Sequence, residues 1–241
     1  MSKDKNKEDF IRENVKAKTT IPTLRDLLQE VYSLHDLSTA CCRQCSCCRV
    51  ACPQMHYSEA SQILDGNVFQ SWSKEDRKEL LVTCLRYFFS DSLIKPCPML
   101  DGETCRSYLD RPLNCRLYGL WPEDVWKKRV EGFSKVIDLP KEKIPLNTQC
   151  QMVKRVNGEV LTIEEIEGMF AALDSVDRQI GDLSEEQIAR NWHVRTLHDW
   201  VLFKFWGEER LIALSELKVA STPEDIPEIL KVFEEAAAKL V

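Results

Sequence analysis

The stretch from Cys41 to Pro53, CCRQCSCCRVACP, holds six of the eleven cysteines in this chain. Cys42, Cys45, Cys48 and Cys52 have the spacing Cys-x2-Cys-x2-Cys-x3-Cys-Pro, which bacterial ferredoxins use around a [4Fe–4S] cluster. Thiolates three residues apart in a tight loop can converge on different irons of one cluster. The proline after the last cysteine ends the turn and fixes the direction in which the chain leaves. This stretch therefore predicts an iron–sulfur site.

A second group of cysteines lies in residues 97–122, where seven and then nine residues separate Cys97, Cys105 and Cys115. Such gaps are weak evidence alone, but these thiols could complete a cluster that takes only three ligands from the first loop. Cys150 has no motif around it and is an open choice between a ligand and a buried thiol. One cluster is the simpler prediction. Two would need all eight candidate ligands: Cys42, Cys45, Cys48, Cys52, Cys97, Cys105, Cys115 and Cys150.

The second group resembles the YkgJ-like cysteine-cluster family, also described as a zinc- or iron-chelating CxxCxxCC domain. The matching positions are Cys97, Cys105, Tyr108, Arg111, Pro112, Cys115, Arg116 and Tyr118. The resemblance covers about residues 41–122 and implies a bound iron–sulfur cluster or zinc. Some relatives are flagellin lysine N-methylases, so it also implies a protein-lysine N-methyltransferase-like enzyme as an alternative.

The first loop departs from the family pattern at its vicinal cysteine pair. The family places this pair after the second Cys-x2 step, whereas here it comes one residue early, at Cys47-Cys48, and Arg49 follows. The departure leaves the roles of Cys41, Cys47 and Cys52 open.

Zinc is the main chemical alternative, because four thiolates suit Zn²⁺ as well as an iron–sulfur cluster. A structural zinc ribbon has two Cys-x2-Cys knuckles, whereas this chain has one short-spaced group and two long gaps, which favours iron–sulfur. Disulfides are disfavoured because eleven cysteines cannot all pair within one chain. A chain of 241 residues can also bury a core without covalent cross-links.

Composition and charge narrow the choice of partners and compartment. A net charge of −6 and a pI near 5.4 argue against nucleic-acid binding, which relies on basic residues. The charged N-terminal stretch lacks the apolar region of a secretory signal, and no apolar run approaches the roughly 18 residues that span a membrane. We expect a cytoplasmic protein without membrane insertion, whose partner is a redox protein or a client enzyme. The oligomeric state stays open.

The rest of the sequence predicts a mainly α fold, with the irregular Cys-rich segment packed on a helical bundle and one small β-hairpin. Thr23, Ser73 and Thr162 precede apolar helical stripes and predict helix N-termini, and a further helix is expected over 123–137. Asn157-Gly158 predicts the hairpin. We expect a flexible charged arm at 1–19, a Cys-rich cluster-binding region at 20–122 and a helical region at 123–241, together forming one continuous domain.

The sequence also makes predictions for several residues outside the cysteine groups. Ser184 opens one long helical tract to about Lys218, and the apolar stretch WVLFKFWG within it favours a buried core. Cys84 lies on an apolar stripe and is predicted to be core rather than ligand. His56 is expected to pack or to face solvent. His193 and His198 would point about 140° apart on a helix, which excludes a metal pair.

Overall fold

The computed structural model describes residues 22–35, 37, 52–90, 92, 95–102, 104–137, 161–181, 183–189 and 193–240. Helices dominate the described residues, which confirms the mainly α class. The N-terminal arm, the cysteine loop up to residue 51 and the predicted Asn157-Gly158 hairpin lie outside them. None of the helices within these ranges combines the length and apolar character needed to cross a membrane.

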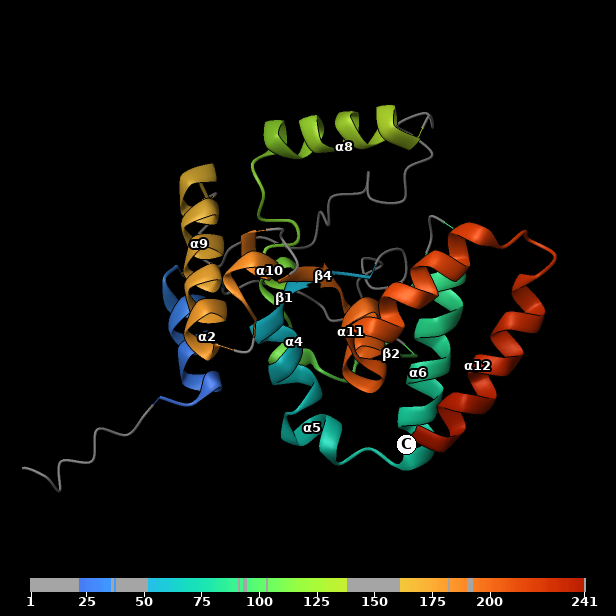
Figure 1. Ribbon diagram of the computed structural model, residues 1–241. Helices are drawn as coiled ribbons and strands as arrows, with labels where there is room; N and C mark the ends of the chain where they lie inside the picture. The colour runs from blue at the N-terminus through green and yellow to red at the C-terminus, as the bar shows by residue number, and fades with distance from the viewer. Residues whose placement is uncertain are drawn as a thin grey trace, which may run out of the picture.

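Helices α2 (Leu24–Ser33) and α9 (Ile163–Ile180) lie side by side at one end of the molecule (Figure 1). Both begin with a capping box, in which the side chain of Thr23 or Thr162 accepts from the backbone of the residue three positions on. Their apolar faces form one core together with the short helix α7 (Leu113–Arg116) and the turn that follows it. The central residues of this core are Leu28, Val31, Leu113, Leu117, Ile166, Met169 and Leu173.

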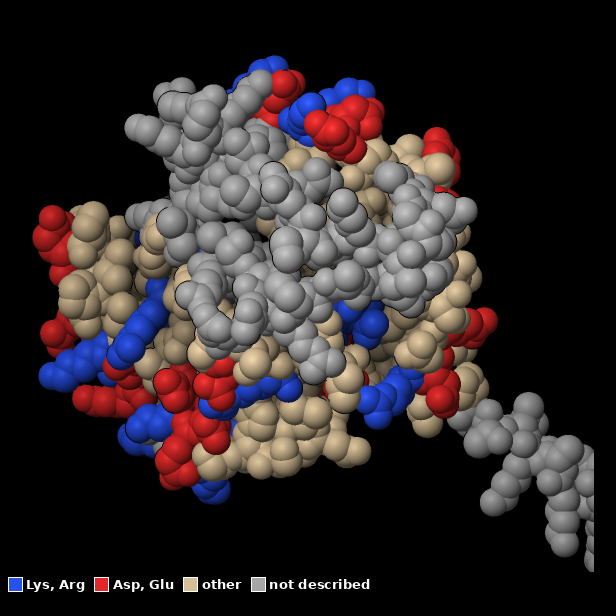
Figure 2. Space-filling view, turned by 180° about the vertical axis from the view of Figure 1, so that it is seen from behind, with Lys and Arg blue, Asp and Glu red and all other residues tan. Residues whose placement is uncertain are grey.

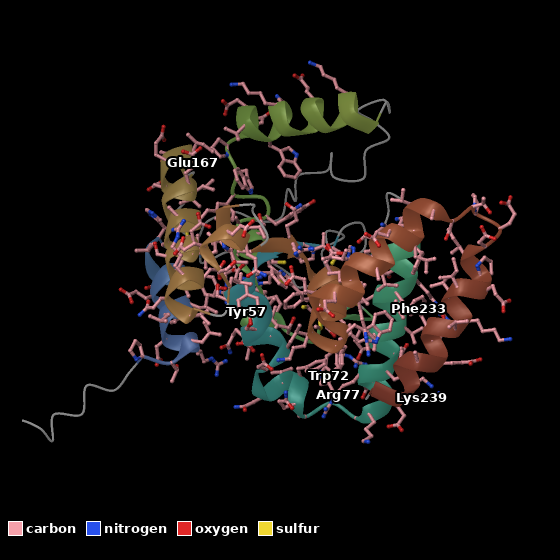
Figure 3. The ribbon with its side chains drawn as sticks, in the orientation of Figure 1. Tyr57, Trp72, Arg77, Glu167, Phe233 and Lys239 are labelled. Carbon is pink, nitrogen blue, oxygen red and sulfur yellow. The ribbon has the colours of Figure 1, made fainter. Side chains whose placement is uncertain are left out.

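A larger core lies among α6 (Lys74–Phe89), α11 (Leu197–Ala220) and α12 (Ile226–Leu240) at the other end (Figure 1). Leu81 and Leu85 of α6 and Trp200 of α11 are almost fully buried there. Phe233 of α12 contacts the rings of Phe89 and Trp206, at 6.5 and 5.4 Å between centroids (Figure 3). WVLFKFWG therefore belongs to the core, as predicted. So does Cys84, which is fully buried.

Helix α4 (Tyr57–Leu64) and a small sheet lie between the two cores. Strand β1 (Gln54–His56) pairs antiparallel with β4 (Val194–Thr196), so that Met55 faces Arg195 in the register. A second pair, β2 (Leu100–Asp101) and β3 (Thr104–Cys105), forms a tight hairpin in which Gly102 has a φ of 59°, a conformation that glycine adopts without strain. Further helices are α5 (Asn67–Gln70), η1 (Tyr108–Asp110) and α8 (Glu123–Ile137), and α8 has the predicted bounds.

The expectation of one helical tract from Ser184 to Lys218 is wrong. Ser184 does cap a helix, but α10 is short (Glu185–Ala189), and β4 separates it from α11. The β-branched residues Val194 and Thr196 pair with β1, and Thr196 then caps α11 by accepting from Asp199 N. Helix α11 is itself kinked at Gly207, where φ is 78°. Pairing with a distant strand therefore overrides the local helical pattern.

Candidate functional site

The structure describes five cysteines, all with free thiols: Cys52, Cys84, Cys97, Cys105 and Cys115. Four of them were predicted as ligands, and Cys84 was not. The other predicted ligands, Cys42, Cys45, Cys48 and Cys150, lie outside the described residues, as do Cys41 and Cys47. The four described ligands and Cys84 can therefore be located relative to one another.

Four of these thiols gather at one edge of the larger core. Cys84 and Cys97 are buried in it, and Cys52 and Cys105 pack against it partly exposed. Burial raises the pKa of Cys84 and of Cys105, and negative charge on Cys97 raises both further. Charges on Cys84, Cys52 and Cys97 all add to the effect of burial on the pKa of Tyr87. All four therefore belong to the larger core or pack against it, and Cys97 acts on the pKa of both Cys84 and Cys105.

The four thiols lie on or beside different secondary-structure elements. Cys52 lies two residues before β1, Cys84 lies within α6, Cys97 precedes the β2–β3 hairpin and Cys105 ends it. Backbone hydrogen bonds close the hairpin segment on itself, from Leu100 N to Cys97 O at 3.0 Å and from Arg106 N to Met99 O at 2.9 Å. Among the described residues, no three sulfurs lie within 4.8 Å of one another. We call Cys52, Cys84, Cys97 and Cys105 the thiol neighbourhood.

Cys115 belongs to α7, near the second core. Its charge contributes to raising the pKa of Tyr32, although burial of that tyrosine is the larger cause. Helix α7 also contacts β1, because Asn114 Nδ2 donates to Gln54 O at 2.7 Å. Cys115 therefore lies on an element that touches the strand directly following Cys52.

A second cluster of chemically active side chains was not predicted. His56, Asp177 and His193 are 3%, 0% and 4% exposed, and one ligating atom of each lies within 4.8 Å of the other two. His56 ends β1, Asp177 lies in α9 and His193 precedes β4. Tyr57 N donates to His193 O at 2.9 Å, which fixes His193 beside His56. The sequence-based expectations for His56, as a packing or surface residue, and for His193, on a helix with His198, both missed this arrangement. We call His56, Asp174, Asp177 and His193 the His–Asp cluster.

Hydrogen bonds orient the members of this cluster. His56 Nδ1 lies 3.0 Å from Asp177 Oδ2 and 3.6 Å from Asp174 Oδ1, while His193 Nε2 lies 2.9 Å from that same Asp174 oxygen. Ser58 N donates to Asp177 Oδ1 at 2.8 Å. Burial lowers the pKa of His56, but the hydrogen bond and charge of Asp177 outweigh it, so the net direction is upward.

A buried carboxylate, Glu59, connects the cluster to the second core. Its oxygens accept from Tyr32 Oη at 2.8 Å, from Leu113 N at 2.5 Å and from His56 N at 3.0 Å. Complete burial raises the pKa of Glu59, and these hydrogen bonds oppose the shift. Glu59 therefore joins α2, α4 and α7 and fixes the backbone of His56 relative to them.

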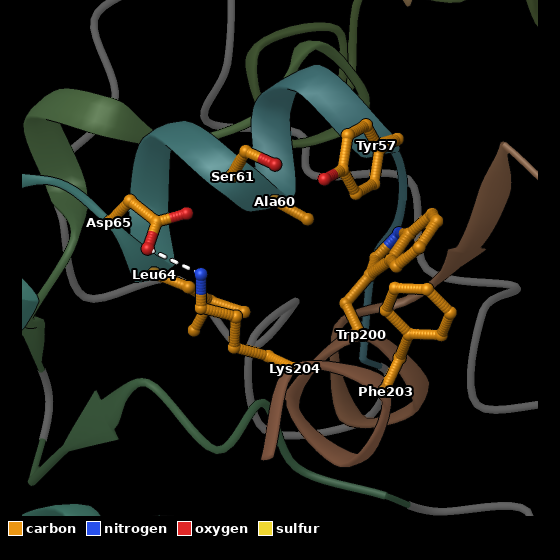
Figure 4. Close-up of a pocket in the computed structure, with 8 residues that line it drawn as sticks. All are labelled: Tyr57, Ala60, Ser61, Leu64, Asp65, Trp200, Phe203 and Lys204. Atoms are coloured by element: carbon orange, nitrogen blue, oxygen red, sulfur yellow. Dashed lines mark hydrogen bonds and ion pairs between the residues drawn. The ribbon is translucent and has the colours of Figure 1, made fainter. Parts of the chain in front are cut away.

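A hollow between α4 and α11 is too small to hold a substrate. Its walls come from two segments, around Tyr57 and Asp65 on one side and Trp200 and Lys204 on the other, and Lys204 Nζ meets Asp65 Oδ1 at 2.5 Å (Figure 4). Its volume of about 40 Å³ is far below the roughly 300–1,000 Å³ of small-molecule pockets. On the face opposite that of Figure 1, the described surface intersperses Lys and Arg with Asp and Glu (Figure 2).

No family model, curated protein or solved structure matches this chain. The positions of its side chains are therefore the main evidence on its chemistry. No local sequence signal marks the His–Asp cluster, because its members come from three segments. The only hint in the sequence is that Asp174, Asp177 and His193 lie fairly close together along the chain. Such groupings are common in proteins where they have no metal-binding or catalytic role.

Proposed function

We propose that this protein binds at least one [4Fe–4S] cluster and serves in electron transfer, or as a cluster-bearing accessory to another enzyme. The observation that carries the proposal is the thiol neighbourhood, which gathers the last cysteine of the ferredoxin-like motif with Cys97 and Cys105. The sequence independently predicts these three residues as ligands.

Chain connectivity supports a role for the rest of the motif. Cys48 precedes Cys52 by four residues, which span at most about 14 Å when fully extended. The motif therefore ends beside the two downstream cysteines of the thiol neighbourhood. A cluster that takes ligands from the motif and from residues 97–105 is compatible with that reach.

The surroundings of the thiols also suit a cluster. The apolar side chains of the larger core line one side of the thiol neighbourhood, and low water access is one of the features that tune a cluster's potential. Burial raises the pKa of Cys105, and the hydrogen bond from Ser107 and then the positive charge of Arg111 oppose that shift in part, both in favour of the thiolate, the form that binds iron. A cytoplasmic location belongs to the same proposal, because a reducing compartment keeps thiols available as ligands.

The test is the content of iron, acid-labile sulfide and zinc in protein purified without oxygen, together with its visible spectrum. About four or eight irons per chain with matching sulfide would support one or two clusters. Stoichiometric zinc in a colourless solution would replace the proposal with a zinc-stabilised interaction module. Binding of S-adenosylmethionine by cluster-loaded protein would favour the methyltransferase alternative.

Two variants and a control sharpen this test. Cys97→Ser and Cys105→Ser each remove a proposed ligand, so iron per chain should fall strongly. Cys84→Ala is the matched control, because Cys84 lies in the same neighbourhood but is predicted to be core. It should lower stability and leave the iron content near the wild-type value. Equal iron in all three variants would remove Cys97 and Cys105 from the ligand set.

A further inference from the structure

We propose that the His–Asp cluster binds one divalent first-row transition metal ion, of the class of Zn²⁺, Co²⁺ or Fe²⁺, separately from the cysteines. The ligands are His56, His193 and Asp177, and Asp174 lies beside both imidazoles. The inference does not depend on the iron–sulfur proposal, because its donor atoms are nitrogen and oxygen alone.

The donor set matches the chemistry of such ions. Two imidazoles and a carboxylate hold zinc in many catalytic sites, and the same combination holds ferrous iron in non-haem oxygenases. Asp174 and Asp177 supply negative charge to offset that of a divalent cation. The hard ions Mg²⁺ and Ca²⁺ prefer sites made of oxygen atoms and fit two imidazoles poorly.

The spacing of the donor atoms is close to that around a small ion. In a tetrahedral site with bonds of about 2.0–2.2 Å, neighbouring donors lie roughly 3.3–3.6 Å apart. Here His56 Nδ1 lies 3.0 Å from Asp177 Oδ2, and one ligating atom each of His56, Asp177 and His193 lie within 4.8 Å of one another. Asp174 Oδ1, which is not among the proposed ligands, lies 3.6 Å from His56 Nδ1 and 2.9 Å from His193 Nε2. Modest shifts of these side chains would therefore admit an ion.

Burial and an unsatisfied nitrogen separate this cluster from an ordinary group of surface residues. His193 is 4% exposed, and its buried Nδ1 has no hydrogen-bond partner among the described residues, a costly state for a polar atom. Ser58 Oγ, one residue from the Tyr57–His193 backbone contact, is also buried and has no partner in that part of the chain. The hydrogen bonds of the cluster thus do not satisfy the His193 ring. A bound ion would satisfy Nδ1 by accepting its lone pair, while Nε2 keeps its hydrogen bond to Asp174 Oδ1.

The surrounding contacts orient the donor atoms. Phe170 stacks on the His56 ring with centroids 6.0 Å apart, and Ser58 N holds one oxygen of Asp177, leaving Oδ2 toward His56. The side chain of Asp174 is 37% exposed, so it connects the buried donors to solvent.

The principal alternative is a hydrogen-bonded network in which each imidazole pairs with one carboxylate. The Asp177→Asn variant distinguishes a metal site from such a hydrogen-bonded network. Asparagine can still accept from Ser58 N and can donate to His56 Nδ1, so the network keeps both contacts while the anionic ligand is lost. His193→Gln removes the second imidazole. His198→Gln is the matched control, because His198 is also a buried histidine but bonds Thr196 outside the cluster.

The experiment is equilibrium dialysis of anaerobically purified, full-length protein against Co²⁺ alone, with the visible spectrum recorded at each concentration. We expect the wild type to bind one Co²⁺ with ligand-field bands and without sulfur-to-cobalt charge transfer. Asp177→Asn and His193→Gln should weaken that binding at least tenfold, and His198→Gln should leave it unchanged. Asp174→Asn should weaken it tenfold to a hundredfold, as expected for a group that orients a ligand.

Three outcomes would overturn the proposal: wild-type protein that binds no Co²⁺ beyond sulfur-ligated ion, binding that is equal in Asp177→Asn, His193→Gln and wild type, or binding lost equally in His198→Gln. The wild-type spectrum is decisive even if a variant fails to fold, because it distinguishes nitrogen and oxygen ligands from sulfur. Cysteines without iron would bind Co²⁺ with sulfur-to-cobalt charge-transfer bands that neither Asp177→Asn nor His193→Gln removes, so the two proposals fail independently.

Discussion

Trp200 Nε1 donates a hydrogen bond of 3.0 Å to the carbonyl oxygen of Met55, and so joins helix α11 to strand β1 across 145 positions of sequence. Both residues are almost fully buried in the larger core. The bond satisfies a backbone acceptor at the middle of β1, the three-residue strand that has Cys52 two residues before it and ends at His56. One strand therefore positions both the thiol neighbourhood and the His–Asp cluster.

Trp200→Phe should lower the free energy of unfolding by about 1–3 kcal/mol for the unsatisfied Met55 carbonyl, plus a smaller packing loss. Chemical denaturation measures this change, provided that the slope of the unfolding free energy against denaturant concentration is the same for both proteins. Trp72→Phe is the control, because its indole packs on Phe69 with centroids 5.3 Å apart and no hydrogen bond from its Nε1 occurs among the described residues. An equal loss in both variants would show that packing, not the hydrogen bond, carries the effect.

Tyr32→Phe removes the hydroxyl that donates to Glu59. Because the acceptor is a buried carboxylate, we expect a loss of about 1.5–3 kcal/mol in the free energy of unfolding. Tyr87→Phe is the control, since the hydroxyl of Tyr87 makes no hydrogen bond within the described ranges. Urea unfolding of the two variants gives the comparison. A Tyr32 variant as stable as the control would mean that Leu113 N and His56 N suffice to stabilise Glu59.

Thr162→Ala should lower the free energy of unfolding by about 1 kcal/mol, because it removes the side-chain acceptor for Glu165 N at the start of α9. The measurement is the thermal midpoint followed by circular dichroism. Ser175→Ala, on the exposed surface of the same helix, is the control and should change stability by less than about 0.5 kcal/mol. If the two substitutions proved equivalent, the capping box would contribute nothing measurable to α9.

The pKa of Asp76 predicts how the stability of the protein changes in acid. The Ser73 hydroxyl and then Arg106 hold the pKa of Asp76 below its ordinary value of 3.8. Its stabilising contribution is therefore fully present above that value and is lost as the pH falls through the lowered pKa of the folded state. The thermal midpoints of wild type and Asp76→Asn should differ at neutral pH and converge in acid. Added salt should reduce the part that comes from Arg106. A difference that did not change with pH would contradict this assignment.

Several helix starts were predictable because their chemistry is local. The cap residues Thr23, Ser73 and Thr162 each bond a group three positions along the chain, a relationship that is already visible in the sequence. The bounds of α8 were also predicted, as were the buried positions of Cys84, from an apolar helical stripe, and of Trp200, from a stretch that is apolar nearly all round. The cysteine motif lies largely outside the described residues, so its ligand assignment stays a prediction.

The sequence by itself determined the helical character of this protein, its caps and the presence of a cysteine-rich segment, because each depends on residues close together in the chain. Only the tertiary structure decided that residues 194–196 form a strand, that Cys52 packs against the core that contains Cys97, and that His56 meets Asp177 across 121 positions. Such contacts depend on how distant elements pack. In a single sequence, periodicity reports which face of an element is buried and does not report what that face will touch.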